Sequence, residues 1–102
     1  GYQNYKELPA LGGIPVDKEF TITFSKGVDI NSARERIVLQ DIVTGDEIPC
    51  EIYLGGVNRI IKIKPTVLLG RGREYILVIH DGIKAEDGAT LNQGVVCRAI
   101  VD

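Results

Sequence analysis

The chain alternates apolar and polar residues over several short stretches, and this period of two residues is typical of β-strands. The clearest stretch is Phe20–Phe24, whose three apolar side chains, Phe20, Ile22 and Phe24, are predicted to lie on one buried face. A second stretch, Arg59–Lys64, places its alternating isoleucines inward and its lysines outward. Both stretches are therefore predicted to be strands with one face in the core.

Four further stretches also have the character of strands. Tyr75–Ile79 is apolar at every position, which predicts a central strand covered on both faces. Ile48–Leu54 alternates with one apolar face, and Pro49 makes it an edge strand because proline cannot donate to a ladder. A shorter strand is predicted at Ile37–Gln40, and the last strand is predicted at Val95–Val101.

One stretch has the character of a helix, and turn residues separate the strands. Asn31–Arg36 is predicted to form a single helical turn, with Asp29 or Asn31 as its N-cap. The strand breaks are expected near Gly27, Gly45, Gly55, Pro65 and Gly82. Short, evenly spaced strands with turns between them predict an all-β fold, an antiparallel β-sandwich of about seven strands.

Composition restricts the class of protein. The 102 residues are enough for one domain, and 44% hydrophobic with 25% charged residues is typical of a globular protein. The net charge of −2 gives no general attraction for nucleic acid, and no apolar run is long enough for membrane insertion. Because the chain begins with Gly1 and contains no methionine, we expect it to be a module of a longer protein.

The segment His80–Leu91 gathers a histidine, two glycines and three carboxylates, those of Asp81, Glu86 and Asp87. Carboxylates are ligands that calcium prefers, but the third and fifth positions counted from Asp81 are apolar, unlike those of an EF-hand loop. We therefore predict a turn, in which an aspartate bonds the backbone and Gly88 adopts a positive φ. Weak calcium binding by the three carboxylates is the alternative, and no cofactor is predicted.

His80 is the single histidine, so a site with several histidine ligands is not possible within this chain. A pair with Cys97 is one alternative, because their strands are expected to be neighbours. Alternation, however, places His80 on the face opposite Leu77 and Ile79. A catalytic pair of cysteine and histidine also needs a third group that orients it, and no such group is recognisable. We therefore predict a half-exposed residue at a strand end, and a protein that is not an enzyme.

Two groups of surface residues are candidates for ligand binding. A basic cluster is predicted to attract an anionic polymer or, more simply, to form a solvated face; it consists of Arg59, Lys62, Lys64, Arg71 and Arg73. Three tyrosines are candidates for a sugar platform, although two of them precede the first predicted strand; they are Tyr2, Tyr5 and Tyr53.

Cys50 and Cys97 both lie in predicted strands with apolar neighbours. In an oxidising compartment a disulfide between them would stabilise the fold by about 3–4 kcal/mol in the chain-entropy model. Two buried free thiols that act as small apolar residues are the alternative. The sequence leaves both possibilities open.

Three motifs, in this order, resemble those of the bacterial Ig-like domain of surface-layer and related cell-surface proteins. They are PALGGIP at 9–15 before FTITFS at 20–25, then PTVLLGRGREY at 65–75, then GIKAEDGATL at 82–91. Tyr75, six residues after Leu69, resembles a tyrosine corner, in which the hydroxyl group bonds nearby backbone. The chain departs from the family at its end, where Cys97-Arg98-Ala99 replaces the usual Phe-x-Thr.

The resemblance implies an Ig-like β-sandwich at residues 9–102, preceded by a linker or a cloning remnant at residues 1–8. It implies a non-enzymatic structural, spacer or protein-interaction module of a larger bacterial protein, located at the cell surface or secreted. Expected partners are neighbouring domains of the same chain, other surface proteins or glycans, but no nucleic acid. The alternative function is an accessory module that binds glycan or calcium and is attached to a surface enzyme or adhesin.

Overall fold

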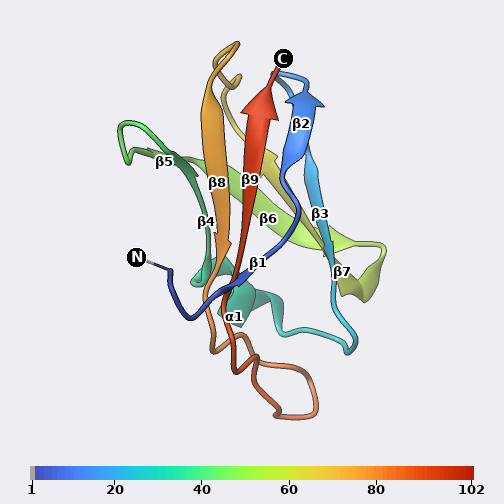
Figure 1. The fold of residues 1–102 in the computed structure, drawn as a ribbon. Helices are drawn as coiled ribbons and strands as arrows, with labels where there is room; N and C mark the ends of the chain where they lie inside the picture. The colour runs from blue at the N-terminus through green and yellow to red at the C-terminus, as the bar shows by residue number, and fades with distance from the viewer. Residues whose placement is uncertain (1) are drawn as a thin grey trace.

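Two β-sheets pack face to face in the computed structural model of the chain, which describes residues 2–102 (Figure 1). The first sheet contains β1 (Lys6–Glu7), β2 (Leu11–Ile14), β4 (Ile37–Asp41), β5 (Glu47–Ile48), β8 (Glu74–Ile79) and β9 (Val95–Val101). The second sheet contains β3 (Phe20–Thr23), β6 (Cys50–Gly55) and β7 (Val57–Pro65). The predicted all-β sandwich is confirmed.

The predicted alternation of the second sheet is also confirmed. β3 pairs antiparallel with β7, so that Phe20 lies opposite Ile63 and Ile22 opposite Ile61. Ile61 and Ile63 have no exposed surface, while the threonines of β3 face solvent. The inward side chains of both sheets form one core, which removes apolar surface from water and is the main stabilising contribution to the fold.

β8 is the central strand of the first sheet, between β9 and β4. Its residues Tyr75, Leu77 and Ile79 belong to the core between the sheets. Val78 points to the outer face, yet it has no exposed surface. Residues 2–8, which we call the N-terminal segment, contact this outer face, where Tyr2 bonds Gln40 and Tyr5 bonds His80. With Val78 buried and Ile76 half-buried there, the strand is largely covered on both sides, as predicted.

The first sheet also contains two parallel pairings, which join the chain before β3 to the last strand. β1 pairs in parallel with the start of β9, where Lys6 lies opposite Val95. β2 pairs in parallel with the end of β9, where Leu11 lies opposite Ala99. The chain thus follows the free edge of β9, and residues 6 and 7 of the predicted linker belong to the sheet. The boundary at residue 8 remains a prediction.

The prediction of one strand over Ile48–Leu54 was wrong. The stretch is divided at Pro49, because β5 pairs with β4 in the first sheet and β6 pairs with β7 in the second. Pro49 has no N–H to donate, but its carbonyl accepts a bond of 2.9 Å from the Thr66 N–H. Both strands are sheet edges, as the proline predicted, and Leu54 is 40% exposed. This division, together with β1 and β2 before the first predicted stretch, accounts for nine strands where about seven were predicted.

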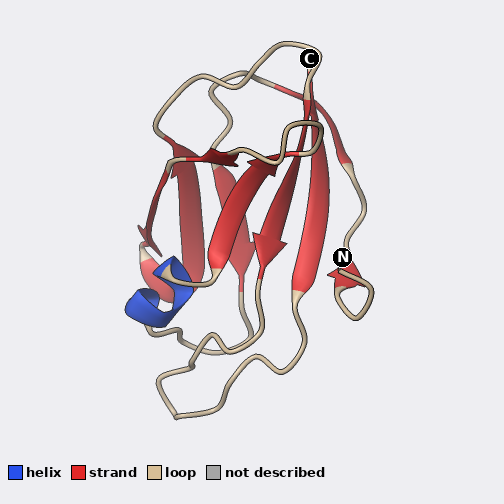
Figure 2. Cartoon of the chain, turned by 90° about the vertical axis from the view of Figure 1, so that its left-hand side faces the viewer, coloured by secondary structure: helices blue, strands red, loops and turns tan. Residues whose placement is uncertain are grey.

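The short helix α1 (Ile30–Arg34) joins the two sheets at one end of the sandwich (Figure 2). It begins one residue before the predicted turn, and Asp29 is its N-cap, because the carboxylate accepts a bond of 3.0 Å from the Asn31 N–H. Within residues 2–102, no helix has the length and apolar character that crossing a membrane requires.

The predicted tyrosine corner is present. The Tyr75 ring is buried, with 4% of its surface exposed, and its hydroxyl oxygen accepts a bond of 2.7 Å from the Gly70 N–H. The neighbouring Leu69 is buried as well, and its N–H donates to the Val16 carbonyl at 2.8 Å. These contacts fix the loop of residues 66–73 on the end of the sandwich opposite α1.

Candidate functional site

The 80–91 loop is a turn of the predicted kind. Asp87 Oδ1 accepts a bond of 2.9 Å from the Ala89 N–H, and Gly88 has a φ of 89°. The other carboxylate oxygen of Asp87 lies 2.9 Å from Lys26 Nζ. This bond to Lys26, followed by the bond to Ala89, holds the pKa of the Asp87 carboxyl below its usual value. Asp87 is therefore an anionic residue that fixes the loop.

The three carboxylates of the loop are not gathered around one point. The Glu86 side chain is hydrogen-bonded by the Asn58 amide, whereas Asp87 is turned to Lys26. In the part of the chain that the structure describes, no three histidine, cysteine or carboxylate side chains lie close enough together to hold a metal ion. Calcium binding by Asp81, Glu86 and Asp87 remains a prediction.

His80 lies on the outer face of the first sheet and contacts the N-terminal segment. Its Nδ1 is 2.6 Å from the Tyr5 hydroxyl group, and the two rings meet edge to face at 5.7 Å. Cys97 is turned to the opposite face, into the core, where Sγ lies 3.5 Å from the Pro9 carbonyl. The structure therefore does not bring His80 and Cys97 together, and His80 is half-buried as predicted.

The three candidate tyrosines do not form one platform. Tyr2 and Tyr5 lie together on the first sheet, with ring centroids 5.2 Å apart. Tyr53 belongs to the second sheet, where its hydroxyl group bonds the Glu19 carboxylate. The structure thus separates Tyr53 from the other two, which are used to hold the N-terminal segment.

The basic cluster is likewise divided between the two sheets. Arg73 Nη2 lies 2.8 Å from the buried Asp41 carboxylate of the first sheet. Lys62 extends over the second sheet, where Nζ donates to Thr21 Oγ1 at 2.9 Å and lies 3.9 Å from Glu19. Arg73 and Lys62 are therefore each engaged with polar or acidic partners on different sheets.

Both cysteines are free thiols in the structure. Burial raises the pKa of the Cys50 thiol to about 11, and it also raises the pKa of Cys97. Neither thiol is thus activated as a nucleophile, because both remain protonated near neutral pH.

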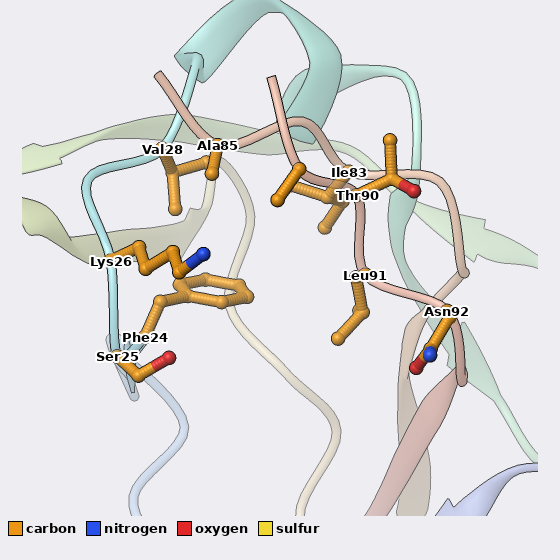
Figure 3. Close-up of a pocket in the computed structure, with 10 residues that line it drawn as sticks. Phe24, Ser25, Lys26, Val28, Ile83, Ala85, Thr90, Leu91 and Asn92 are labelled. Carbon is orange, nitrogen blue, oxygen red and sulfur yellow. The ribbon is translucent and has the colours of Figure 1, made fainter. Parts of the chain in front are cut away.

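A pocket of about 210 Å³ opens beside the 80–91 loop, at the end of the sandwich that carries α1 (Figure 3). Phe24 and Leu91 face each other across it, and Val28 and Ile83 complete its apolar wall. Its rim is polar and is formed by Ser25, Lys26, Thr90 and Asn92. Of the described residues that line the pocket, none is a histidine, cysteine or carboxylate, so this arrangement suits binding of an apolar group.

Sequence reasoning missed this pocket. Two segments that are far apart in sequence, residues 24–28 and 83–92, form its opposite walls. Ala85 and Ala89 also line it, and their small side chains leave space that larger residues would fill. The two alanines in the middle of a polar loop are the one local sign of the pocket that the sequence contains.

Comparison with known proteins identifies the family. A family model described as a bacterial Ig-like domain matches residues 9–98. The chain belongs to this family. No curated protein matches the chain in sequence.

Solved structures agree with the Ig-like fold. The N-terminal part of the bacterial S-layer protein SbsC superposes with a TM-score of 0.69 and 16% identity, over 96% of this chain and 24% of that chain. PcoC, a copper resistance protein from Escherichia coli, has a TM-score of 0.71 and 12% identity, with 91% of each chain covered. E. coli alpha-2-macroglobulin has a TM-score of 0.67 and 18% identity, over 86% of this chain and 5% of that chain. SbsC and alpha-2-macroglobulin are larger proteins, and the chain spans about a quarter or less of each.

Proposed function

We propose that this Ig-like domain is a non-enzymatic structural module that spaces neighbouring domains along a larger bacterial cell-surface or secreted protein. The main support is the path of the chain. β1 lies beside the start of β9, and β9 ends at the opposite end of the sandwich (Figure 1). The described chain begins at the side of the sandwich, whereas β9 ends at its top, so sequences attached before and after would leave the domain at well-separated places (Figure 1).

The parallel pairing also suits a connecting role under tension. Force applied to the two ends of the chain acts along β9 and along the strands beside it, so their hydrogen bonds are sheared together rather than opened one after another. The bonds that join this edge include Lys6 N–H to the Gly94 carbonyl at 2.8 Å and Leu8 N–H to the Val96 carbonyl at 2.9 Å. At the other end, Asp102 N–H donates to the Ile14 carbonyl at 2.9 Å.

A single-molecule force measurement tests the proposal. The domain is placed between two identical folded reference domains and is extended from its two ends. We expect one cooperative unfolding event, and the Leu8→Pro variant is expected to unfold at lower force because it lacks the N–H that bonds Val96. The matched control is Leu8→Ala, which shortens the side chain but keeps this N–H.

The proposal is contradicted if the domain extends gradually at low force, or if Leu8→Pro and Leu8→Ala lower the unfolding force equally. Small-angle scattering of the same fusion provides an independent measurement. The two reference domains are expected to be held apart by the body of the domain, whose longest extent is 41 Å. Reference domains side by side would exclude a spacer.

A further inference from the structure

We propose that two copies of this chain exchange their N-terminal segments, so that residues 2–8 of each copy bind to β9 of the other. The binding site consists of His80, Gly94, Val95 and Val96, and we call it the strand acceptor. The partner is a second copy of the same chain. This inference does not rest on the spacer role, because a domain that keeps its segment in place can still separate its neighbours.

The strand acceptor has a shape that fits one particular side chain of the N-terminal segment. Gly94 is buried, and a Cβ atom at this position would lie 2.5 Å from the Tyr5 ring. The ring therefore occupies a notch that exists because residue 94 has no side chain. Beside the notch, His80 Nδ1 lies 2.6 Å from the Tyr5 hydroxyl group. The acceptor thus recognises a tyrosine by both its shape and its hydroxyl group.

The acceptor also recognises an extended backbone. Lys6 N–H donates to the Gly94 carbonyl at 2.8 Å, and Leu8 N–H donates to the Val96 carbonyl at 2.9 Å. These bonds add a parallel strand to the edge of β9, which is a recurring way in which a sheet binds a peptide. The segment that fills the site within one chain therefore shows what an exchanged segment has to provide.

The N-terminal segment is held by few contacts besides these. Of residues 2–8, Tyr2 and Tyr5 have partly buried side chains, and the others are exposed. The strand that pairs with β9 here is two residues long. Segments with little buried surface open at a lower free energy than the whole domain unfolds. The segment is therefore expected to separate from β9 while the sandwich stays folded.

The acceptor keeps its shape when the segment leaves. β8 pairs with the other edge of β9 from Val95 to Ile100. β2 remains on the same edge as the acceptor but farther along it, where Leu11 lies opposite Ala99. An edge whose N–H and carbonyl groups are unpaired is a template for another strand. An open copy therefore presents a preformed site.

The connection between β1 and β2 has the character of a hinge. Residues 8–10 join the paired positions of the two strands, whereas β9 spans the same interval with two residues, 97 and 98. The connection thus has one residue of slack. Residues 8–10 are exposed, and Pro9 has no N–H with which to bond the edge. By straightening, this connection can lead the segment to a second molecule.

Reciprocal exchange selects a second copy as the partner. When two copies exchange segments, each acceptor regains the Tyr5 ring, the bond to His80 and both backbone bonds. The contacts of the closed chain are thus restored twice, and the remaining cost is that of bringing two molecules together. Such an exchange uses the same surface on both molecules, so it closes as a two-fold dimer.

Two variants separate the segment from the acceptor. Gly94→Val blocks the acceptor but keeps Tyr5, whereas Tyr5→Ser keeps the acceptor but loses the ring. Gly94 does not have a positive φ, so the valine acts through its contact with Tyr5. Each variant alone should be monomeric in sedimentation equilibrium. An equal mixture should form dimers but nothing larger, with a Kd on the order of 1 mM because the contact is small.

Isotope-filtered NMR tests the exchange in the unchanged chain. Labelled and unlabelled copies are mixed in equal amounts at about 2 mM, above the expected Kd. Magnetisation transfer from Tyr5 of a labelled copy to His80 of an unlabelled copy is expected. The same transfer is expected in the mixture of variants, from Tyr5 of Gly94→Val to His80 of Tyr5→Ser.

Matched controls change the same residue types elsewhere. Gly12→Val is the control for the glycine, because a Cβ atom there has no neighbour within 4 Å. Tyr53→Ser, on the second sheet, is the control for the tyrosine. A mixture of these two variants should associate like the unchanged chain. Thermal melting verifies folding, and Gly94→Ala replaces Gly94→Val if that variant does not fold.

Three results would overturn the inference. The first is a mixture of Gly94→Val and Tyr5→Ser that remains monomeric at about 2 mM. The second is dimerisation of either variant alone with the affinity of the mixture, which would place the contact on another surface. The third is an unchanged chain without magnetisation transfer between Tyr5 and His80 of different copies, which would mean that the segment stays in its own chain.

Discussion

The hydroxyl group of Tyr5 lies 2.6 Å from Nδ1 of His80, although the two residues are 75 positions apart in the chain. Tyr2 lies beside both rings, and its hydroxyl group donates to Gln40 Oε1 at 3.3 Å. The N-terminal segment is thereby fixed across the outer face of β4 and β8. Val78, on the same outer face of β8, has no exposed surface.

Removal of residues 2–8 is expected to lower the free energy of unfolding by about 2 kcal/mol or more, because it exposes Val78 and Val96 on the outer face. Urea unfolding of the shortened chain, which begins at Pro9, measures this loss. The control replaces residues 2–8 with a glycine-serine sequence of equal length. If the shortened chain is as stable as the full chain, residues 2–8 are a linker, and the coverage of β8 is of no energetic importance.

Tyr5→Phe is expected to reduce the loss of stability at alkaline pH. Burial, followed by the nearby Asp81 carboxylate, raises the pKa of Tyr5 above its ordinary value of 10.0. The unfolded chain therefore ionises first, and the stabilising contribution is complete below pH 10.0 and is lost as the pH rises through the higher pKa of the folded state. Urea midpoints at pH 8 and 11 measure the difference.

The control for this measurement is Tyr53→Phe, on the other sheet. Its bond to Glu19, followed by burial, also raises the pKa of Tyr53, so part of the alkaline loss belongs to that residue. Each variant should remove its own part. An alkaline loss that is the same in Tyr5→Phe and in the unchanged chain would contradict the assignment.

Tyr75→Phe is expected to lower the free energy of unfolding by about 0.5–1.5 kcal/mol, because the partly buried Gly70 N–H loses its acceptor while the ring stays in place. Thermal or urea unfolding at pH 7 measures the effect. Tyr53→Phe, whose hydroxyl group is at the surface, should cost much less. A neutral Tyr75→Phe variant would mean that water replaces the hydroxyl group, and the tyrosine corner would then contribute no stability.

Asp41→Asn is expected to make the fold less sensitive to acid and less stable at pH 7. The carboxylate accepts bonds from Thr44 N–H and Val43 N–H and pairs with Arg73; the bond from Thr44 has the largest effect in lowering the Asp41 pKa. The stabilising contribution is therefore present above pH 3.8 and is lost as the pH falls through the lower pKa of the folded state. Thermal midpoints from pH 7 to 2 measure this loss of stability, and Asp46→Asn is the control. Equal dependence of the midpoint on acid pH in Asp41→Asn and in the unchanged chain would contradict this expectation.

Alkylation by iodoacetamide should be slow at Cys50. With a pKa of about 11 in place of the ordinary 9.0, the thiolate fraction at pH 8 is about 100-fold lower than in a free cysteine, and burial slows the reaction further. Mass spectrometry of the folded chain measures the rate, and the chain in urea is the control. Equal rates in the two samples, or a mass without reductant that shows a disulfide, would contradict two buried free thiols.

Particular residues show how far the sequence predicts this fold. The alternation of Phe20, Ile22 and Ile61 predicted the strands of the second sheet and their inward faces, because a strand exposes every second side chain to the same face. The tyrosine corner at Tyr75 and the turn at Asp87 were predicted too, since each depends on residues close in sequence. At Pro49, by contrast, the same alternation continued through a break between two sheets.

The candidate site was likewise predicted only in part. The sequence identified the polar residues of the 80–91 loop, but it did not reveal the pocket beside that loop, because Phe24 belongs to a different segment of the chain. It also did not reveal that Leu68 is exposed, since Leu69 beside it is buried and the two are alike in character. Which of two adjacent leucines is buried depends on the path of the loop.

The sequence by itself determined the all-β class, the positions of most strands and the family motifs, because these depend on side-chain alternation and on local turn chemistry. The tertiary structure alone decided the parallel pairing of β1 and β2 with β9, the contact between Tyr5 and His80, and the pocket at one end opposite an exposed loop at the other. These features join residues far apart in the chain, and their energies arise only when the two sheets have packed and have fixed which surfaces meet.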